Sequence, residues 1–179
     1  YSIDRWFVKF NFEDDKFAYY SFAVSMLNII MVLIQSIALT FYNYFSKMKD
    51  REQICNIKTI LLGIGTAASL GYFVLAFIVD KFIPAYVGSL EVIAISFAAY
   101  PFMIVINTVF LNLYKAEKRD KSYLKSVIFM IIISVILNCI AIIFKSIQAI
   151  AWATTVSFAI WYIYCHNSFE WKYFSVKRS

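Results

Sequence analysis

The chain has few charged residues for its length, and glycine, proline, histidine and cysteine are scarce as well. Charged side chains make up 16% of the 179 residues, with four glycines, two prolines, one histidine and three cysteines. Soluble domains carry about 25% charged residues, which cover the surface that faces water. The shortage excludes an ordinary soluble enzyme and a disordered tail. A hydrophobic fraction of 62% stands in place of the charges and indicates a chain that lies in a bilayer.

The few reactive side chains give no sign of a catalytic or metal site. Cys55, Cys139 and Cys165 lie far apart without a Cys-x-x-Cys pair, so they predict neither a disulfide framework nor a metal site. His166 is the only histidine, and we interpret it as an interfacial side chain. The chain contains neither a GxSxG elbow nor a phosphate-binding GK[ST] loop. We therefore expect no enzyme activity, no metal and no cofactor.

Uncharged runs organise the sequence. A helix needs about 20 apolar residues to cross the hydrocarbon core of a bilayer. Five runs have the required length, and they do not alternate polar with apolar residues as membrane strands do. We predict an all-α polytopic membrane protein in which residues 1–16 are the end of a truncated helix with an outer connection, and residues 17–179 are the transmembrane bundle with a short cytoplasmic tail. The predicted spans are 17–46, 59–79, 92–114, 126–144 and 147–168.

The basic residues predict the orientation of these spans. The net charge of +6 comes from short clusters between apolar runs, which favours contact with anionic lipid over nucleic acid. Twelve of the seventeen lysines and arginines fall in 47–58, 115–125 and the C-terminal tail, and five fall in the alternate connections. Cytoplasmic loops carry the excess of positive charge. We therefore expect those three segments, including the C-terminus, to be cytoplasmic.

Neutral polar residues lie on one side of several predicted spans. In lipid, an unsatisfied amide costs several kcal/mol, so these side chains should face protein or a wet cavity. They allow two interpretations: a hydrophilic path for a polar solute, or hydrogen bonds that hold helices together. The residues that we assign to this candidate path are Asn28, Gln35, Tyr100, Asn107 and Asn138.

Two further features concern packing and shape. Gly63, Ala67 and Gly71 follow the small-xxx-small spacing that lets helix backbones approach closely, so we predict a packing face there. Pro101 lies inside the third span, where it removes one backbone hydrogen bond and should kink the helix. Such a kink is either a hinge or a static bend.

Asp4 and Arg5 are the ionisable residues of most interest. If residues 1–12 are the end of a spanning helix, this pair lies at membrane depth, where charged side chains are costly and usually functional. If the segment is an external loop, we expect no functional role for the pair. We favour membrane depth.

The order of these segments resembles the polysaccharide flippases of the multidrug/oligosaccharidyl-lipid/polysaccharide exporter superfamily, over nearly the whole chain but matching only the C-terminal half of such a protein. The small-residue turn before residue 154 departs from the family pattern, because Ser146 and Ala149 stand where the family usually has glycine. The segments that carry the resemblance are Asp4-Arg5, Tyr20-Ser21-Phe22-Ala23, 86–89, the span with Pro101, Leu113-Tyr114-Lys115-Ala116 and 146–154.

The resemblance implies one six-helix half of a twelve-helix carrier in the bacterial inner membrane. Such a carrier passes a lipid-linked oligosaccharide from the cytoplasmic to the outer leaflet by alternating access. Arg5 would meet phosphate and Asp4 would couple to an ion, H⁺ or Na⁺. The partners implied are the lipid-linked oligosaccharide and the missing N-terminal half of the same protein. Two alternatives remain open: a multidrug and toxin extrusion type cation antiporter half, and a membrane scaffold that transports nothing.

Overall fold

The computed structural model describes residues 3–45 and 51–174. Side chains are described for residues 3–32, 36 and 52–169. The described chain is all-α and contains no strand, as the sequence predicts. The helices are α1 (Ile3–Asn11), α2 (Asp14–Phe45), α3 (Arg51–Ser69), α4 (Gly71–Phe82), α5 (Leu90–Phe97), α6 (Tyr100–Val105), α7 (Leu111–Ala116), α8 (Asp120–Ile143) and α9 (Ile147–Phe174), with a 3-10 turn at Pro84–Ser89 and a π-helical turn at Ile106–Phe110.

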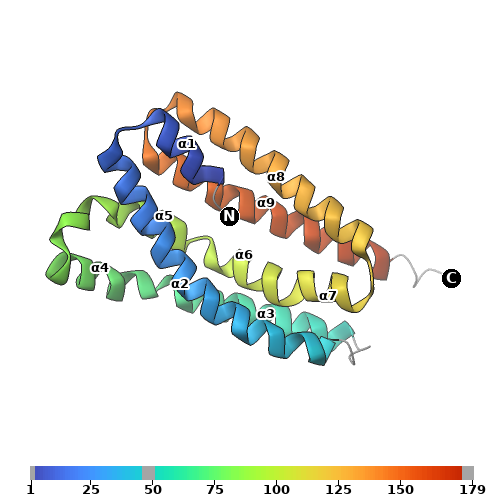
Figure 1. Cartoon of the computed structure of the whole chain (residues 1–179). Helices are drawn as coiled ribbons and strands as arrows, with labels where there is room; N and C mark the ends of the chain where they lie inside the picture. The colour runs from blue at the N-terminus through green and yellow to red at the C-terminus, as the bar shows by residue number, and fades with distance from the viewer. Residues whose placement is uncertain (1–2, 46–50, 175–179) are drawn as a thin grey trace.

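The helices form an elongated bundle whose connections alternate between its two ends (Figure 1). The α1–α2, α4–α5 and α8–α9 connections lie at one end. The α7–α8 connection and the C-terminal end of α9 lie at the other. The connection at 115–119 and the end of α9 therefore share one end of the bundle, as the alternation of basic clusters requires.

Three helical segments in the described chain are long and apolar enough to cross a membrane: Glu52–Phe82, Asp120–Ile143 and Ile147–Phe169. A fourth candidate consists of the two arms Pro84–Phe97 and Tyr100–Ala116, which meet at an angle of 50°. The helix of the first segment begins before the predicted residue 59 and runs 31 residues, with a step at Leu70 between α3 and α4. Their length and composition are typical of membrane-spanning helices.

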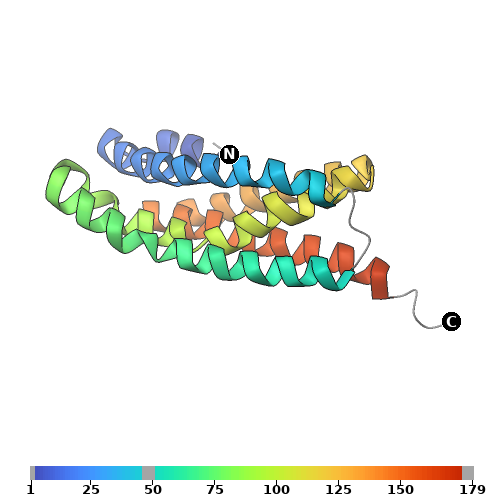
Figure 2. The same cartoon turned by 90° about the horizontal axis from the view of Figure 1, so that it is seen from below.

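The bent segment from α5 to α7 lies at the centre of the bundle. It packs against α2 on one side, α3 on another and α9 on a third, and α8 packs on the outside of α9. Figure 2 shows α2 and the α3–α4 segment along opposite sides of the molecule with this segment between them. Its side chains are accordingly among the most buried, including Ile93, Tyr100, Ile106 and Tyr114.

Large apolar side chains also cover the outside of the bundle. Phe73, Val74 and Phe77 are exposed on α4, and Ile132 and Ile136 are exposed on α8. Monomeric soluble proteins rarely expose continuous apolar surfaces of this kind. In a bilayer this surface faces lipid chains, which agrees with the length and composition of the helices.

Candidate functional site

Asp4 lies on the first turn of α1 and is buried, with both carboxylate oxygens accepting hydrogen bonds. Tyr20 of α2 donates its hydroxyl to Asp4 Oδ2 at 2.7 Å, and Arg5 donates its backbone N–H to Asp4 Oδ1 at 3.0 Å. Asp4 is 7% exposed, and the start of α1 lies near the middle of the bundle (Figure 1). A carboxylate removed from water costs several kcal/mol unless it is well compensated. A buried acid of this kind is more often functional than structural.

Arg5 reaches from α1 to the polar side of α2. Its Nη2 donates to Ser25 Oγ at 3.2 Å, and Ser25 Oγ donates to the carbonyl of Ser21 at 2.8 Å. Arg5 Nε is buried and makes no hydrogen bond within the described part of the chain. A guanidinium has five N–H donors, so Arg5 retains donors for an anionic group.

The larger of two cavities beside Asp4 has a volume of about 310 Å³ and lies between α1, α7, α8 and α9. Its lining is mainly apolar and aromatic, with Phe158 and Trp161 of α9 and Tyr123 of α8. Asp4 and Ser134 bring polar groups to it. This combination of apolar walls and a few convergent polar groups is typical of small-molecule sites.

The smaller cavity, of about 30 Å³, lies on the other side of Asp4, between α2, α5, α6 and α9. Tyr20 and Asn28 of α2 line it. Asp4, Thr154 and Phe158 line both cavities and so form the wall between them. The Thr154 hydroxyl is buried in this wall without a well-formed hydrogen bond to any described residue. The buried acid therefore lies between two cavities, of which the larger reaches the surface at the exposed side chains of Ile3 and Ile131.

The kink predicted at Pro101 is present as a 50° bend, with the break at 98–99 and Pro101 in the first turn of α6. Pro101 has no N–H to donate to the carbonyl of Phe97. Ser69 of α3 supplies the missing donor, with its Oγ 2.8 Å from the Phe97 oxygen. Thr155 of α9 donates to the carbonyl of Ile95 at 3.0 Å. Ser69 thus satisfies the carbonyl that Pro101 leaves without a donor, whereas Thr155 adds a second donor to the Ile95 carbonyl, which also accepts the Ala98 N–H at 3.2 Å.

Close backbone packing fixes the same break, but through a different glycine from the ones that the spacing predicts. A Cβ built on Gly65 would lie 2.6 Å from the Cα of Pro101, so only glycine fits there. Gly63 and Ala67 are exposed, and a Cβ on Gly63 would meet nothing within 4 Å. A Cβ on Gly71 would be in ordinary contact with a ring carbon of Phe97 at 3.9 Å. The close backbone approach in the described chain therefore lies at Gly65, and the packing face Gly63-Ala67-Gly71 stays a prediction.

The predicted polar path is only partly assembled. Asn28 is exposed yet lines the smaller cavity, and buried Tyr100 donates to the carbonyl of Leu27 at 3.3 Å. Asn107 donates to the carbonyl of Met103 at 2.8 Å and lies in neither cavity lining. The side chain of Gln35 lies outside the described residues.

Asn138 is fully buried on α8 and bonds within its own helix. Its Nδ2 donates to the carbonyl of Ser134 at 2.8 Å, while its Oδ1 has no hydrogen bond among the described residues. Of the four path residues whose side chains the structure describes, Asn28 alone lines a cavity beside Asp4. The sequence did not single out Tyr20, which is the direct partner of Asp4. A tyrosine inside an apolar run carries no signal of its own.

The remaining reactive side chains hold helices together. Trp161 donates its Nε1–H to Ser126 Oγ at 2.6 Å, and Cys165 Sγ lies 3.2 Å from the same oxygen. His166 Nδ1 lies 3.1 Å from Lys58 Nζ, which connects α9 to α3. Within the described residues no three histidine, cysteine, aspartate or glutamate side chains gather into a metal-binding group.

Comparison with known proteins returned no match among protein-family models, curated proteins or solved structures.

Proposed function

We propose that this chain forms one half of a membrane transporter that carries lipid-linked oligosaccharide from the cytoplasmic to the outer leaflet. The observation that supports transport is Asp4, a buried carboxylate in the wall between two cavities of an apolar helical bundle. Ionisable residues at membrane depth are characteristic of substrate and proton pathways. The substrate class follows from the resemblance to the polysaccharide flippases.

Arg5 supports an anionic substrate group. Its buried Nε has no partner among the described residues, whereas Nη2 is engaged by Ser25. A pyrophosphate oxygen has the charge and geometry that a guanidinium N–H prefers. We propose that Arg5 contacts the sugar-linked phosphate while the lipid tail stays in the bilayer.

Asp4 is the proposed coupling group, for H⁺ or Na⁺. As a carboxylate it accepts from both Tyr20 and the Arg5 backbone. If a proton binds to Oδ2, that oxygen becomes a donor and its hydrogen bond from the Tyr20 hydroxyl must be rearranged. Because Asp4 is on α1 and Tyr20 is on α2, ion binding changes the contact between these two helices. A two-state contact of this kind is what alternating access requires.

The same proposal assigns the membrane arrangement. We propose that α2, the α3–α4 segment, the bent α5–α7 segment, α8 and α9 each cross the membrane, with α1 as the end of a further crossing. In this arrangement the end of the bundle with the α7–α8 connection and the C-terminal end of α9 faces the cytoplasm and its anionic lipids. The membrane is a bacterial inner membrane. The bent segment, held by Ser69 and Thr155, is the proposed hinge. A companion half of six helices completes the carrier.

Conservative substitutions in the full-length protein, expressed in its own cells, test this function. Asp4→Asn keeps the side-chain size and Arg5→Gln shortens the side chain, and both remove a charge. Each should abolish surface polysaccharide while immunoblots show normal protein in the membrane. Lys9→Gln is the matched control, because Lys9 is exposed on the same helix and pairs only with Asp14 at 3.6 Å in the described chain. Normal glycan display in both site variants would contradict the proposal.

A second candidate is a cation exporter of the same superfamily. The larger cavity supports it, because Asp4 shares that lining with Tyr123, Phe158 and Trp161. A carboxylate together with aromatic faces is a chemistry that binds organic cations. If Asp4→Asn left polysaccharide intact but sensitised cells to a cationic dye, this candidate would replace the first.

A further inference from the structure

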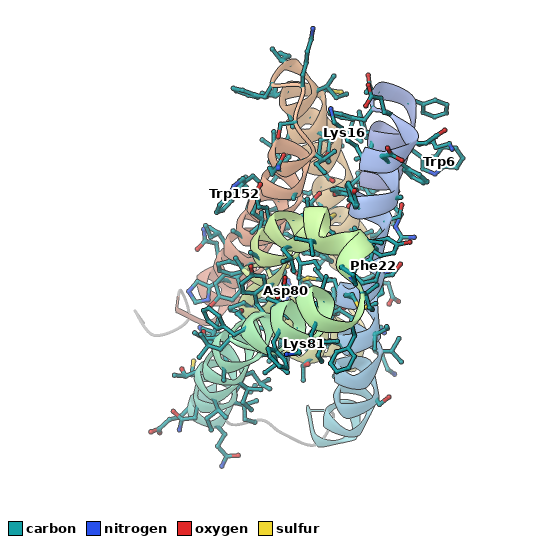
Figure 3. All side chains as sticks on the ribbon, turned by 90° about the vertical axis from the view of Figure 1, so that its left-hand side faces the viewer. Trp6, Lys16, Phe22, Asp80, Lys81 and Trp152 are labelled. Carbon is teal, nitrogen blue, oxygen red and sulfur yellow. The ribbon has the colours of Figure 1, made fainter. Side chains whose placement is uncertain are left out.

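A surface cleft of about 600 Å³ lies at the end of the bundle where the α1–α2 turn faces the C-terminal end of α8. Phe10, Phe12 and Lys16 line it from one side, and Ile142 and Lys145 from the other. Figure 3 shows Lys16 at the end of the molecule where α2 meets the α8–α9 hairpin. This cleft is separate from the cavities beside Asp4 and plays no part in the proposed transport step.

The cleft carries a net positive charge. Neither Lys16 nor Lys145 forms an ion pair with any carboxylate of the described residues. The neighbouring acid Asp14 pairs instead with Lys9, with 3.6 Å between Nζ and Oδ1. Glu13 is the one carboxylate in the lining, so two ammonium groups face one acid. An anionic group placed there would be attracted by both lysines.

Lys145 holds its position in the cleft in a backbone conformation that disfavours lysine. Its φ of 49° lies in the left-handed region, and its N–H donates to the carbonyl of Ile142 at 2.9 Å as α8 ends. Glycine is the usual residue at such a helix end, because a Cβ there is sterically disfavoured. The attraction between a cation and the helix C-terminus offsets only part of that strain. The Lys145 side chain lines the cleft and brings its positive charge there.

Exposed apolar side chains border the two lysines. Phe10 is 76% exposed, Ile143 75% and Phe144 70%, so they form a strongly exposed apolar surface beside the cleft. A ligand that matches the cleft has an anionic head for the lysines and apolar chains for this border.

We propose that the cleft binds an anionic phospholipid, with the phosphate between Lys16 and Lys145 and the acyl chains along Phe10, Ile143 and Phe144. Charge complementarity favours phosphatidylglycerol over zwitterionic lipids, because the cleft has one positive charge in excess. The glycerol hydroxyls of that headgroup can donate to Glu13. The inference requires only that the chain lies in a membrane, and it is independent of what the chain transports.

Native mass spectrometry of the purified chain, titrated with phosphatidylglycerol, measures this binding. Lys16→Gln should weaken the tightest lipid site about fivefold, because each basic residue near a lipid surface contributes about 1 kcal/mol. Lys145→Gly should weaken it to a similar degree while leaving thermal stability unchanged or higher, since glycine accepts a φ of 49°. The second variant separates loss of binding from loss of folding. Lys81→Gln, at an exposed lysine on α4 outside the cleft (Figure 3), is the control and should bind within twofold of the unmodified chain.

Three results would overturn the inference. Unchanged phosphatidylglycerol binding in both cleft variants would show that Lys16 and Lys145 do not contribute to the lipid site. Equal affinity for phosphatidylcholine would exclude recognition of the charge. Displacement of the lipid by millimolar inorganic phosphate would assign the cleft to a soluble anion instead of a phospholipid.

Discussion

The sharpest test of the structure compares two glycines on the same helix. Gly65 and Gly63 are two residues apart on α3, and a change of either to alanine adds the same methyl group. At Gly65 the new Cβ would lie 2.6 Å from Pro101 Cα, 3.0 Å from Pro101 N and 3.2 Å from the carbonyl oxygen of Tyr100. At Gly63 it would meet nothing within 4 Å. The two substitutions should therefore change stability in opposite directions.

The magnitude at Gly65 follows from the contact distance. Non-bonded carbons are most stable about 3.5–4.0 Å apart, so α3 must move away from α6 by roughly 1 Å, because all three neighbours are backbone atoms. Overpacking of this kind costs about 1–3 kcal/mol. The shift also lengthens the 2.8 Å hydrogen bond from Ser69, one turn further along α3, which adds about 0.5–1.5 kcal/mol. Alanine gains about 1 kcal/mol of helix propensity over glycine, so the net loss is about 0.5–3.5 kcal/mol.

Gly63→Ala carries only the propensity gain and should stabilise the chain by about 0.5–1 kcal/mol. Reversible unfolding of the purified chain in mixed detergent micelles, followed by circular dichroism, measures both changes against the unmodified protein. The reasoning is refuted if Gly65→Ala is as stable as Gly63→Ala, since the close approach of α3 to Pro101 would then not exist. A loss of equal size at Gly63 would refute it too, because that face would then be packed.

Four further substitutions test the site by the same unfolding measurement. Ser69→Ala removes the side-chain donor to the Phe97 carbonyl and should cost about 1–3 kcal/mol, and no loss would show that this carbonyl needs no donor from α3. Thr155→Val should cost less, about 0.5–1.5 kcal/mol, because the Ile95 carbonyl keeps its hydrogen bond from the Ala98 N–H, and a loss as large as that of Ser69→Ala would contradict this. Tyr20→Phe removes the donor to Asp4 Oδ2 and should cost about 1–3 kcal/mol, whereas Tyr20→Phe on an Asp4→Asn background should cost clearly less, and equal losses would mean that the two residues are not coupled. Asn138→Leu should be neutral or stabilising, because the amide bonds only to its own helix and its Oδ1 has no partner among the described residues, and a loss above about 2 kcal/mol would indicate a partner elsewhere.

The sequence by itself determined the helical class, the helix-forming runs and the bend before Pro101. These follow from local physics: apolar runs of sufficient length form helices in a bilayer, and proline removes a fixed backbone donor. The sequence also indicated Asp4 as a candidate functional residue, because a charged side chain is unusual beside an apolar segment.

Only the tertiary structure decided which face of each helix meets another helix. In a soluble helix the apolar stripe marks the buried face, but in lipid the outer face is apolar as well, so Gly63 and Gly65 look alike in the sequence. The partners of the break, Ser69 and Thr155, lie 28 and 60 residues from the carbonyls that they satisfy. Tyr20 becomes the partner of Asp4 only because α1 folds back on α2. Scarce charge indicates a membrane protein, and packing between its helices decides where its polar groups meet.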